Sequence, residues 1–257
     1  MLYGDNIIMK TLIWMNNMRT IICQNYDELS DHGAKLIASQ IILKPDSVLG
    51  FATGSTPVGI YSRLTDMFKR GEISFKDITT FNLDEYYPID PSNEQSYHYF
   101  MMHNLFNNID IDKNNIHIPN GRASDTEKEC ADYEALIEKH GGIDLQLLGI
   151  GQNGHIGFNE PDATLETGTH LTALTESTIN ANSRFFKSSG EVPRNALTMG
   201  IATILKSRKI ILAACGKNKH DAVAALLTDE IDTQIPATML KVHPDVVLIC
   251  DRDAYEG

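Results

Sequence analysis

The sequence predicts an α/β fold organised around a mainly parallel β-sheet. From residue 19 onward, short β-branched or apolar runs alternate with longer amphipathic runs, which is typical of consecutive βαβ units. The chain has 257 residues, of which 42% are hydrophobic, so it can bury a sizeable core. No repeat or Pro/Gly/Ser-rich linker interrupts the alternation, and we therefore expect one domain over residues 18–257.

In the first part of the chain, the expected strands and helices alternate up to residue 140. The strands lie at residues 21–23, 47–52 and 78–83, and the helices at residues 26–43, about 57–70, 95–106 and 124–140. The last of these helices has Ser124 and Glu127 at the spacing of a capping box. Gly141 and Gly142 follow it as a stop signal.

In the second part, a strand at residues 143–150 runs directly into the segment GQNGHIGFNEP at residues 151–161. Further strands are expected at residues 171–174, 209–214 and 246–250, and helices at residues 196–205 and about 219–227. Ligands of open parallel sheets bind at the carboxyl ends of the strands. Three polar segments, TGSTP, NLDEY and GQNGHIGFNEP, lie at such ends and mark the expected site.

The charge balance excludes a phosphate-rich polymer as a partner. Asp and Glu number 34 against 22 Lys and Arg, and the formal net charge is -12, so most of the surface repels nucleic acid. A small anionic substrate must therefore be bound by local donors.

The cysteines and the N-terminus indicate a cytoplasmic protein. The four cysteines, at positions 23, 130, 215 and 250, have no CxxC spacing, and three lie in apolar runs where a free thiol behaves as a small hydrophobe. No apolar stretch is long enough for a membrane span, and no cleavage site of a signal peptide is present. We expect residues 1–17 to be an extension outside the fold, because Met18 directly precedes the first convincing strand.

The segment at residues 53–57 has the features of a phosphate-binding turn. Gly54 permits a tight turn from strand to helix, and Ser55 or Thr56 is placed to cap the helix. Pro57 suits the first helical position. Free amides, the helix dipole and two hydroxyls would together attract a phosphate monoester, although an ordinary capped helix start is the alternative. The spacing matches neither a nucleotide P-loop nor a dinucleotide fingerprint.

Two neighbouring carboxylates follow the expected strand at residues 78–83. Asp84 and Glu85 lie where a carboxylate can be held close to a ligand in partly apolar surroundings, and such a group can move a proton between adjacent carbons. The alternative is that Asp84 caps the following loop and Glu85 is solvated.

A histidine in the glycine-rich segment is the second acid–base candidate. His155 lies in a tight loop with Gly154 and Gly157, and imidazole gives and takes a proton near neutrality. Either Asn153 or the Glu160 carboxylate can accept a hydrogen bond from one ring nitrogen, which leaves the other nitrogen free as a base.

A metal site is not predicted. His98 and His103 are spaced five apart on an expected helix, and no His or Cys pairs recur at the intervals of a zinc site.

These segments together resemble the glucosamine-6-phosphate deaminase family over about residues 18–251. The motifs GFATGSTP, FNLDEYYPI, GIGQNGHIGFNEP and ANSRFF occur in the family's order and spacing. The resemblance implies a Rossmann-like three-layer αβα sandwich. It also implies hydrolysis and isomerisation of glucosamine 6-phosphate to fructose 6-phosphate and ammonia in amino-sugar catabolism, with no cofactor.

The resemblance implies a role for each matching residue. Asp84 would move the C2 proton to C1 through an enolamine, His155 would open the sugar ring, and Glu160 would partner this histidine. The implied substrate-binding and phosphate-binding residues are Gly54, Ser55, Thr56, Arg184 and Lys219. The last two would supply the local positive charge that an acidic chain needs.

Two departures from the family pattern imply differences in behaviour. Many members have Asp where this chain has Asn153, which can orient His155 but cannot stabilise its imidazolium by charge. Allosterically activated members carry basic residues after the NEP motif and a longer tail, whereas His170 and Thr172 stand in the matching stretch here. From the first departure we expect a shift in the pH dependence of the activity rather than a loss of activity. From the second we expect no allosteric activation by N-acetylglucosamine 6-phosphate.

Two other functions are weighed against this one. The related 6-phosphogluconolactonases are hydrolases that share the phosphate turn, but they lack the combination of FNLDEY and GHIGFNEP. A non-catalytic sugar-phosphate sensor would add a DNA-binding module or lose acid–base residues, and this chain keeps Asp84, His155 and Glu160. Whether the chain is a monomer or a homo-oligomer is left undetermined by the sequence.

Overall fold

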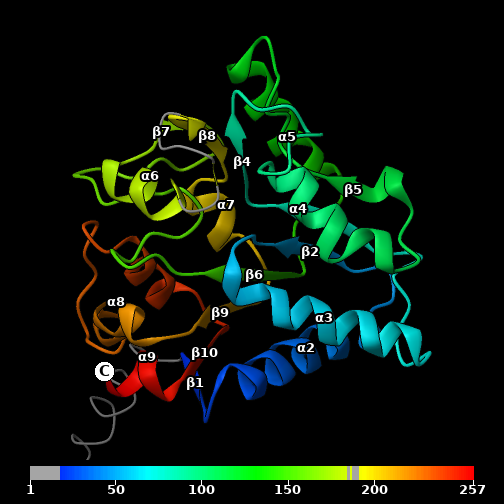
Figure 1. The fold of residues 1–257 in the computed structure, drawn as a ribbon, viewed down its shortest axis with the longest axis horizontal. Helices are drawn as coiled ribbons and strands as arrows, with labels where there is room; N and C mark the ends of the chain where they lie inside the picture. Colours follow the sequence, from blue (N-terminus) through cyan, green and yellow to red (C-terminus); the bar gives the residue numbers. More distant parts are fainter. Residues whose placement is uncertain (1–17, 184–185, 187–190) are drawn as a thin grey trace, which may run out of the picture.

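A seven-stranded parallel sheet forms the centre of the computed structural model, which describes residues 18–183, 186 and 191–257 (Figure 1). The strand order is β1-β10-β9-β6-β2-β3-β5, and each neighbouring pair is parallel. The strands are β1 (Arg19–Cys23), β2 (Val48–Phe51), β3 (Thr79–Asn82), β5 (Ile116–His117), β6 (Leu145–Gly149), β9 (Ile210–Ala214) and β10 (Val246–Asp251). The predicted α/β fold with a mainly parallel sheet is confirmed.

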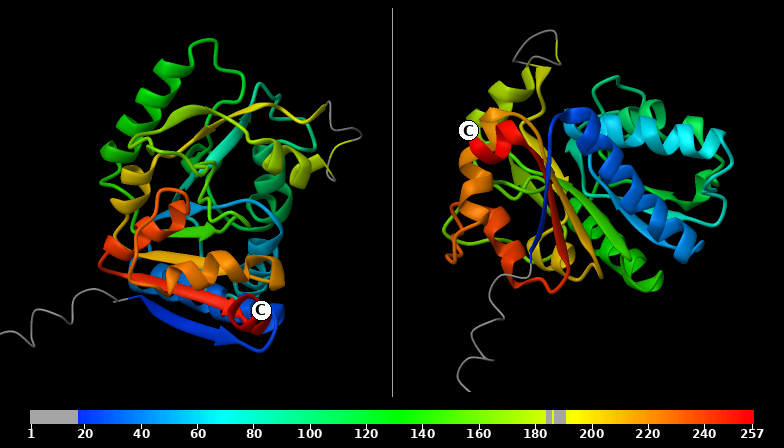
Figure 2. Two further views of the ribbon diagram at one scale, coloured as in Figure 1. Left: turned by 90° about the vertical axis from the view of Figure 1, so that its left-hand side faces the viewer. Right: turned by 90° about the horizontal axis from the view of Figure 1, so that it is seen from below.

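Helices cover both faces of this sheet and make a three-layer αβα sandwich (Figure 2). One face packs against α2 (Tyr26–Leu43), α3 (Ser55–Lys69) and α4 (Tyr97–Asn104), and the other against α5 (Thr126–Lys139), α7 (Ile201–Leu205), α8 (His220–Leu226) and α9 (Arg252–Glu256). Strand β10 shows why both layers form. Val246 and Leu248 enter one hydrophobic cluster while Val247 and Ile249 enter the other, so every side chain of the strand needs a covering helix.

A second, antiparallel sheet lies beside the carboxyl ends of the central strands, near the top of Figure 1. Its order is β4 (Asp84–Tyr87), β8 (Asn195–Thr198) and β7 (His170–Ala173). The helix predicted at residues 196–205 is wrong in its first part, because residues 195–198 pair with β4 and the helix begins only at Ile201. The fully buried Ala196 and Leu197 fit a strand covered on both sides.

The ends of α5 show one wrong and one correct prediction. The N-cap is Asp125, whose Oδ1 accepts a hydrogen bond from the backbone N–H of Lys128 at 2.9 Å, so Ser124 does not form the predicted capping box. The predicted stop is confirmed, since Gly141 and Gly142 both adopt positive φ angles of 82° and 83°.

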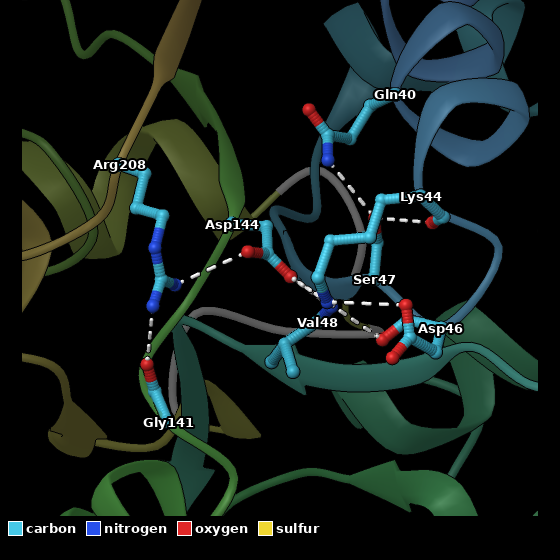
Figure 3. Close-up of polar contacts among 8 residues, drawn as sticks. All are labelled: Gln40, Lys44, Asp46, Ser47, Val48, Gly141, Asp144 and Arg208. Carbon is cyan, nitrogen blue, oxygen red and sulfur yellow. Dashed lines mark hydrogen bonds and ion pairs between the residues drawn. The ribbon is translucent and has the colours of Figure 1, made fainter.

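At the amino ends of β2 and β6, a buried carboxylate joins several elements (Figure 3). Asp144 accepts hydrogen bonds from Lys44 Nζ at 2.9 Å and from the backbone N–H of Val48 at 2.8 Å. Arg208 reaches its other oxygen at 3.1 Å. This network lies at the edge of the sheet opposite to the polar segments that the sequence singled out.

The N-terminal extension predicted at residues 1–17 lies outside the described residues. In the described part of the chain, no helix combines the length and apolar character that crossing a membrane requires. All four cysteines are free, and three of them are buried as expected, whereas Cys215 is partly exposed.

Candidate active site

A cavity of about 550 Å³ lies at the carboxyl ends of β9, β6, β2 and β3, which are neighbours in the sheet. It is lined by residues that follow these four strands, together with Tyr97 from α4 and Thr178 from α6 (Glu176–Asn182). The three polar segments that the sequence singled out all reach it, as the position of ligand sites in open parallel sheets predicts. The segment after β9 is the fourth contributor.

The turn after β2 differs in detail from the prediction. Gly54, with a φ of 103°, is itself the N-cap of α3, and no side chain caps the helix. Ser55 and Thr56 are therefore the first two helical residues, and Pro57 is the third rather than the first. The first amides are consequently not taken by a capping side chain, and they face the carboxyl end of the sheet with the positive end of the helix dipole. An anion in the cavity can accept hydrogen bonds from these amides.

The segment after β9 adds a cation to the same cavity. Lys219 is the one cationic side chain among the described residues of the lining. Gly216 donates its backbone N–H to both carboxylate oxygens of Asp251 at 3.0 Å, which anchors the start of this segment to the end of β10. Arg184, the other predicted phosphate ligand, lies outside the described residues.

The cysteine in the lining is held as a thiol. Sγ of Cys215 lies 2.9 Å from Oδ2 of Asp251. Burial and this carboxylate raise the pKa of Cys215 to about 12, so the group is neutral and is no nucleophile at ordinary pH.

Asp84 is buried at the start of β4, and its surroundings favour the protonated form. Its Oδ1 has no hydrogen-bond partner among the described residues. Burial and the neighbouring charge of Glu85 raise the pKa of Asp84 to about 8. Tyr97 and Phe158, whose rings stack with centroids 5.9 Å apart, also line this part of the cavity.

Glu85 is not solvated, and so the alternative sequence interpretation of this pair is wrong. The side chain is 2% exposed and accepts backbone N–H bonds from Tyr86, Tyr97 and His98 at 2.8–2.9 Å. Two of these donors belong to the first turn of α4, where the helix dipole also favours a negative charge. Burial still raises the pKa of Glu85 to about 7, but this lies below the value of about 8 for Asp84, so we assign the first negative charge of the pair to Glu85.

Gly157 brings the glycine-rich segment against Asp84. A Cβ atom at this position would lie 3.6 Å from Oδ2 of Asp84 and only 2.8 Å from Oγ1 of Thr198. The φ of Gly157 is +59°, which L side chains rarely adopt. Only glycine fits both the backbone and the space.

His155 and Glu160 form the second titratable group of the cavity. Nδ1 of His155 lies 3.3 Å from Oε2 of Glu160, an ion-pair distance without the alignment of a hydrogen bond. Asn153 donates from Nδ2 to the same carboxylate oxygen at 2.7 Å. Of the two ring partners left open by the sequence, the structure selects Glu160. Asn153 instead contacts the carboxylate and accepts the backbone N–H of His155 at 3.3 Å.

The Glu160 carboxylate is held in its charged form. Burial would raise its pKa, but the contacts with His155, Thr178 and Asn153 lower it to about 2. Thr178 is a contact that the sequence did not predict, because it lies 18 residues further along the chain on a helix that was not expected. No feature of the sequence near Thr178 indicates this contact with Glu160.

The cavity therefore combines an anion-binding end with two acid–base groups of opposite character. Asp84 favours its proton, whereas Glu160 is charged and stands beside an imidazole. Such a pair can accept and return protons at two positions of one bound molecule. Within the described ranges, no three His, Cys, Asp or Glu side chains gather as a metal site.

Comparison with known proteins gives relatives over most of the chain. The family model described as glucosamine-6-phosphate isomerases/6-phosphogluconolactonase matches residues 24–248. A protein of Thermoanaerobacter pseudethanolicus named glucosamine-6-phosphate deaminase is 58% identical over 237 residues, which is 92% of this chain and 94% of the relative. A protein of the same name from Halothermothrix orenii is 56% identical over 237 residues, which is 92% of this chain and 98% of the relative.

Solved structures show the same similarity in three dimensions. A monomeric glucosamine-6-phosphate deaminase has a TM-score of 0.90 and 47% identity, over 92% of this chain and 98% of that one. The 6-phosphogluconolactonase from Trypanosoma cruzi has a TM-score of 0.74 and 20% identity, over 94% and 97% of the two chains. The second likeness shows the fold alone.

Proposed function

The chain belongs to the family of glucosamine-6-phosphate isomerases and 6-phosphogluconolactonases, and we propose that it is a glucosamine-6-phosphate deaminase. It converts glucosamine 6-phosphate and water to fructose 6-phosphate and ammonia. Two relatives that carry this name are 58% and 56% identical to it, whereas the solved lactonase from Trypanosoma cruzi is 20% identical. The observation that carries the assignment is a proton-retaining Asp84 in the same cavity as the His155–Glu160 pair.

The substrate phosphate binds, in this proposal, between the start of α3 and the segment after β9. No side chain caps the start of α3, so the backbone N–H groups and hydroxyls of Ser55 and Thr56 can donate to the phosphate, and Lys219, which lines the same cavity, supplies a positive charge. Gly54 allows the turn, and Arg184 is the second cation that the resemblance implies. Local donors of this kind offset the net charge of -12.

Ring opening is the proposed work of His155. The base must take the proton of the C1 hydroxyl and return a proton to the ring oxygen. Glu160 lies 3.3 Å from Nδ1, so the charged carboxylate stabilises a proton on this nitrogen and leaves Nε2 for the sugar. Asn153 donates to the same carboxylate oxygen.

Asp84 is the proposed shuttle between C2 and C1. A carboxylate whose pKa is about 8 is a far stronger base than an exposed one, so it can remove the weakly acidic C2 proton of the opened sugar. The enolamine that results accepts this proton at C1, and water then replaces nitrogen at C2 as ammonia leaves. The electron pair stays within the substrate throughout, and the reaction therefore requires no external oxidant or reductant and no cofactor.

The finer classification is also a proposal. The net reaction breaks a C–N bond with water, which makes the enzyme a hydrolase in amino-sugar catabolism. The cytoplasmic location expected from the sequence is part of this proposal. The solved deaminase of 47% identity is monomeric, which supports a monomer with hyperbolic, non-allosteric kinetics here.

Assaying the purified protein with two substrates tests the function. Ammonia release from glucosamine 6-phosphate, without hydrolysis of 6-phosphogluconolactone, is the expected result. Lactone hydrolysis without ammonia would assign the protein to the other branch of the family, and binding of both sugars without turnover would make it a sensor.

A further inference from the structure

Glu160 is held at both of its carboxylate oxygens. Oε2 faces Asn153 and His155 at 2.7 and 3.3 Å. Oε1 accepts a hydrogen bond from the hydroxyl of Thr178, which is 5% exposed and also lines the cavity. The contact joins α6 to the glycine-rich segment across 18 residues of sequence.

The start of α6 fixes the position of the Thr178 side chain. Thr175 is the N-cap residue, and its Oγ1 accepts the backbone N–H of Thr178 at 3.2 Å. Its hydroxyl proton points to Oγ1 of Thr178, also at 3.2 Å. The charged Glu160 carboxylate can only accept, so the single hydroxyl proton of Thr178 is directed at it and Thr175 is the donor to Thr178.

We propose that Thr178 is a positioning residue for the acid–base pair: its hydroxyl fixes the plane of the Glu160 carboxylate so that Oε2 stays beside His155. This inference rests on the proposed function. The terminal torsion of a glutamate is soft, so one anchored oxygen is needed to define where the other lies. Asn153 binds the same oxygen as His155 and cannot supply that anchor alone.

Removing the hydroxyl is expected to slow the chemical step while substrate binding stays intact. In Thr178→Val the shape of the side chain is kept, but Oε1 of Glu160 becomes a buried acceptor without a donor. The Glu160 carboxylate is then expected to rotate toward another donor. The expected loss in kcat is about 10- to 100-fold, which corresponds to one charge-assisted hydrogen bond, with KM nearly unchanged. Thr178→Ser keeps the donor and is expected to restore most of the rate.

The pH profile gives a second readout that a purely structural defect would not move. The Thr178 hydroxyl is one of the contacts that hold the pKa of Glu160 low, so its loss raises this pKa. Protonation of the carboxylate then begins at higher pH as the solution is acidified. Below the limb that Asp84 sets, protonation of Glu160 makes the rate fall more steeply. This steeper fall is expected to begin at higher pH in Thr178→Val than in the wild type, and to stay in place in Thr178→Ser.

The matched control is Thr172→Val on β7, which removes a threonine hydroxyl that bonds only weakly to Ala173 at 3.4 Å. Its rate and pH profile are expected to equal those of the wild type. Equal kcat and equal acid limbs for Thr178→Val and the wild type, with both folded by circular dichroism, would overturn the proposal. Equal impairment of the Val and Ser variants would also overturn it.

A measurement without turnover separates this proposal from the proposed function. The chemical shift of Nδ1 of His155, observed by NMR in the free enzyme, is expected to be the same in the wild type and Thr178→Ser and to differ in Thr178→Val, because it reports the position of the neighbouring Glu160 carboxylate. If the wild type released no ammonia, the proposed function would be wrong. The NMR comparison of the wild type with the two variants would still decide the role of Thr178. An unchanged Nδ1 signal in Thr178→Val would exclude the positioning role.

Discussion

Asp84 and Glu85 are adjacent and both buried, yet only Glu85 is hydrogen-bonded as a charged carboxylate. Glu85 accepts three backbone N–H groups, two of them from the start of α4, whereas Oδ1 of Asp84 accepts none from the described residues. Burial raises the pKa of both carboxyls, but the three backbone donors hold that of Glu85 at about 7, below the value of about 8 for Asp84. Glu85 therefore ionises first, and Asp84 keeps its proton to higher pH. This division of roles sets the pH dependence that the enzyme should show.

The rate of the wild type should rise with pH toward about 8. Asp84 removes the C2 proton only when it is ionised, and burial together with the Glu85 charge raises its pKa to about 8. In Glu85→Gln the amide oxygen can still accept from one of the two α4 amides, which donate to different oxygens of Glu85. The charge is gone, so the pKa of Asp84 falls. The corresponding limb of kcat/KM is expected to move to lower pH.

The matched control for this charge removal is Glu127→Gln, an exposed residue at the start of α5. Its profile should coincide with that of the wild type. A Glu85→Gln profile that also coincided with the wild type would show that the two carboxylates do not interact.

Asn153→Asp should remain active and move the acid limb upward. Asn153 now donates to Oε2 of Glu160 at 2.7 Å, and an aspartate there brings a second negative charge beside Glu160 and His155. Two carboxylates bind a shared proton more tightly than one, so the cluster takes up its proton at higher pH. Steady-state rates across the acid range measure the shift, and an inactive variant with an intact fold would contradict this interpretation of Asn153.

Saturation with glucosamine 6-phosphate should be hyperbolic, and N-acetylglucosamine 6-phosphate should change it little. The stretch after the NEP motif places His170 and Thr172 on β7, where the Nδ1 of His170 is already 2.9 Å from the carbonyl of Gly168. Initial rates with and without the effector, together with sedimentation, test this. A sigmoidal curve that the effector makes hyperbolic would be incompatible with the non-allosteric proposal.

Asp144→Ala should reduce stability without reducing kcat. The substitution leaves the backbone N–H of Val48 without its acceptor and breaks the contacts with Lys44 and Arg208, at a cost of about 1–3 kcal/mol. The network (Figure 3) lies at the amino ends of β2 and β6, and none of its residues lines the active-site cavity. Urea unfolding measures the loss in the free energy of unfolding.

The exposed pair of Asp132 and Lys128 on α5 provides the control for that loss. Asp132→Ala should change the free energy of unfolding by no more than about 0.5 kcal/mol. If Asp144→Ala lowered the free energy of unfolding by no more than this control, the buried network would not stabilise the sheet. If Asp144→Ala lowered kcat at a temperature where the protein is folded, the amino and carboxyl ends of the strands would be coupled.

The central sheet and the site segments could be predicted from the sequence because their signals are local. The run at residues 143–150 is apolar, and the glycines and His155 follow it directly. The antiparallel sheet could not be predicted, since β4 begins with two carboxylates and pairs with residues more than 100 positions away. Glu85 illustrates the difference, because its burial depends on amides that α4 supplies.

The same distinction separates the predicted from the unpredicted residues of the site. Asn153, His155 and Glu160 lie within eight positions of one another, so their proximity follows from a single loop. Thr178 reaches Glu160 only because β7 pairs with β8 and places α6 over the cavity. At the turn after β2, Gly54 rather than Ser55 is the N-cap of α3. Gly54 has a φ of 103°, and the amino-acid sequence does not reveal this backbone conformation.

The proton shuttle is tested most directly by ammonia release in Asp84→Asn. The amide keeps the size of the side chain but cannot accept the C2 proton, so ammonia release should fall by at least about 1,000-fold, while calorimetry shows unchanged binding of fructose 6-phosphate. Lys219→Ala should show the opposite pattern, with weakened binding. Wild-type ammonia release by a folded Asp84→Asn protein would contradict the account.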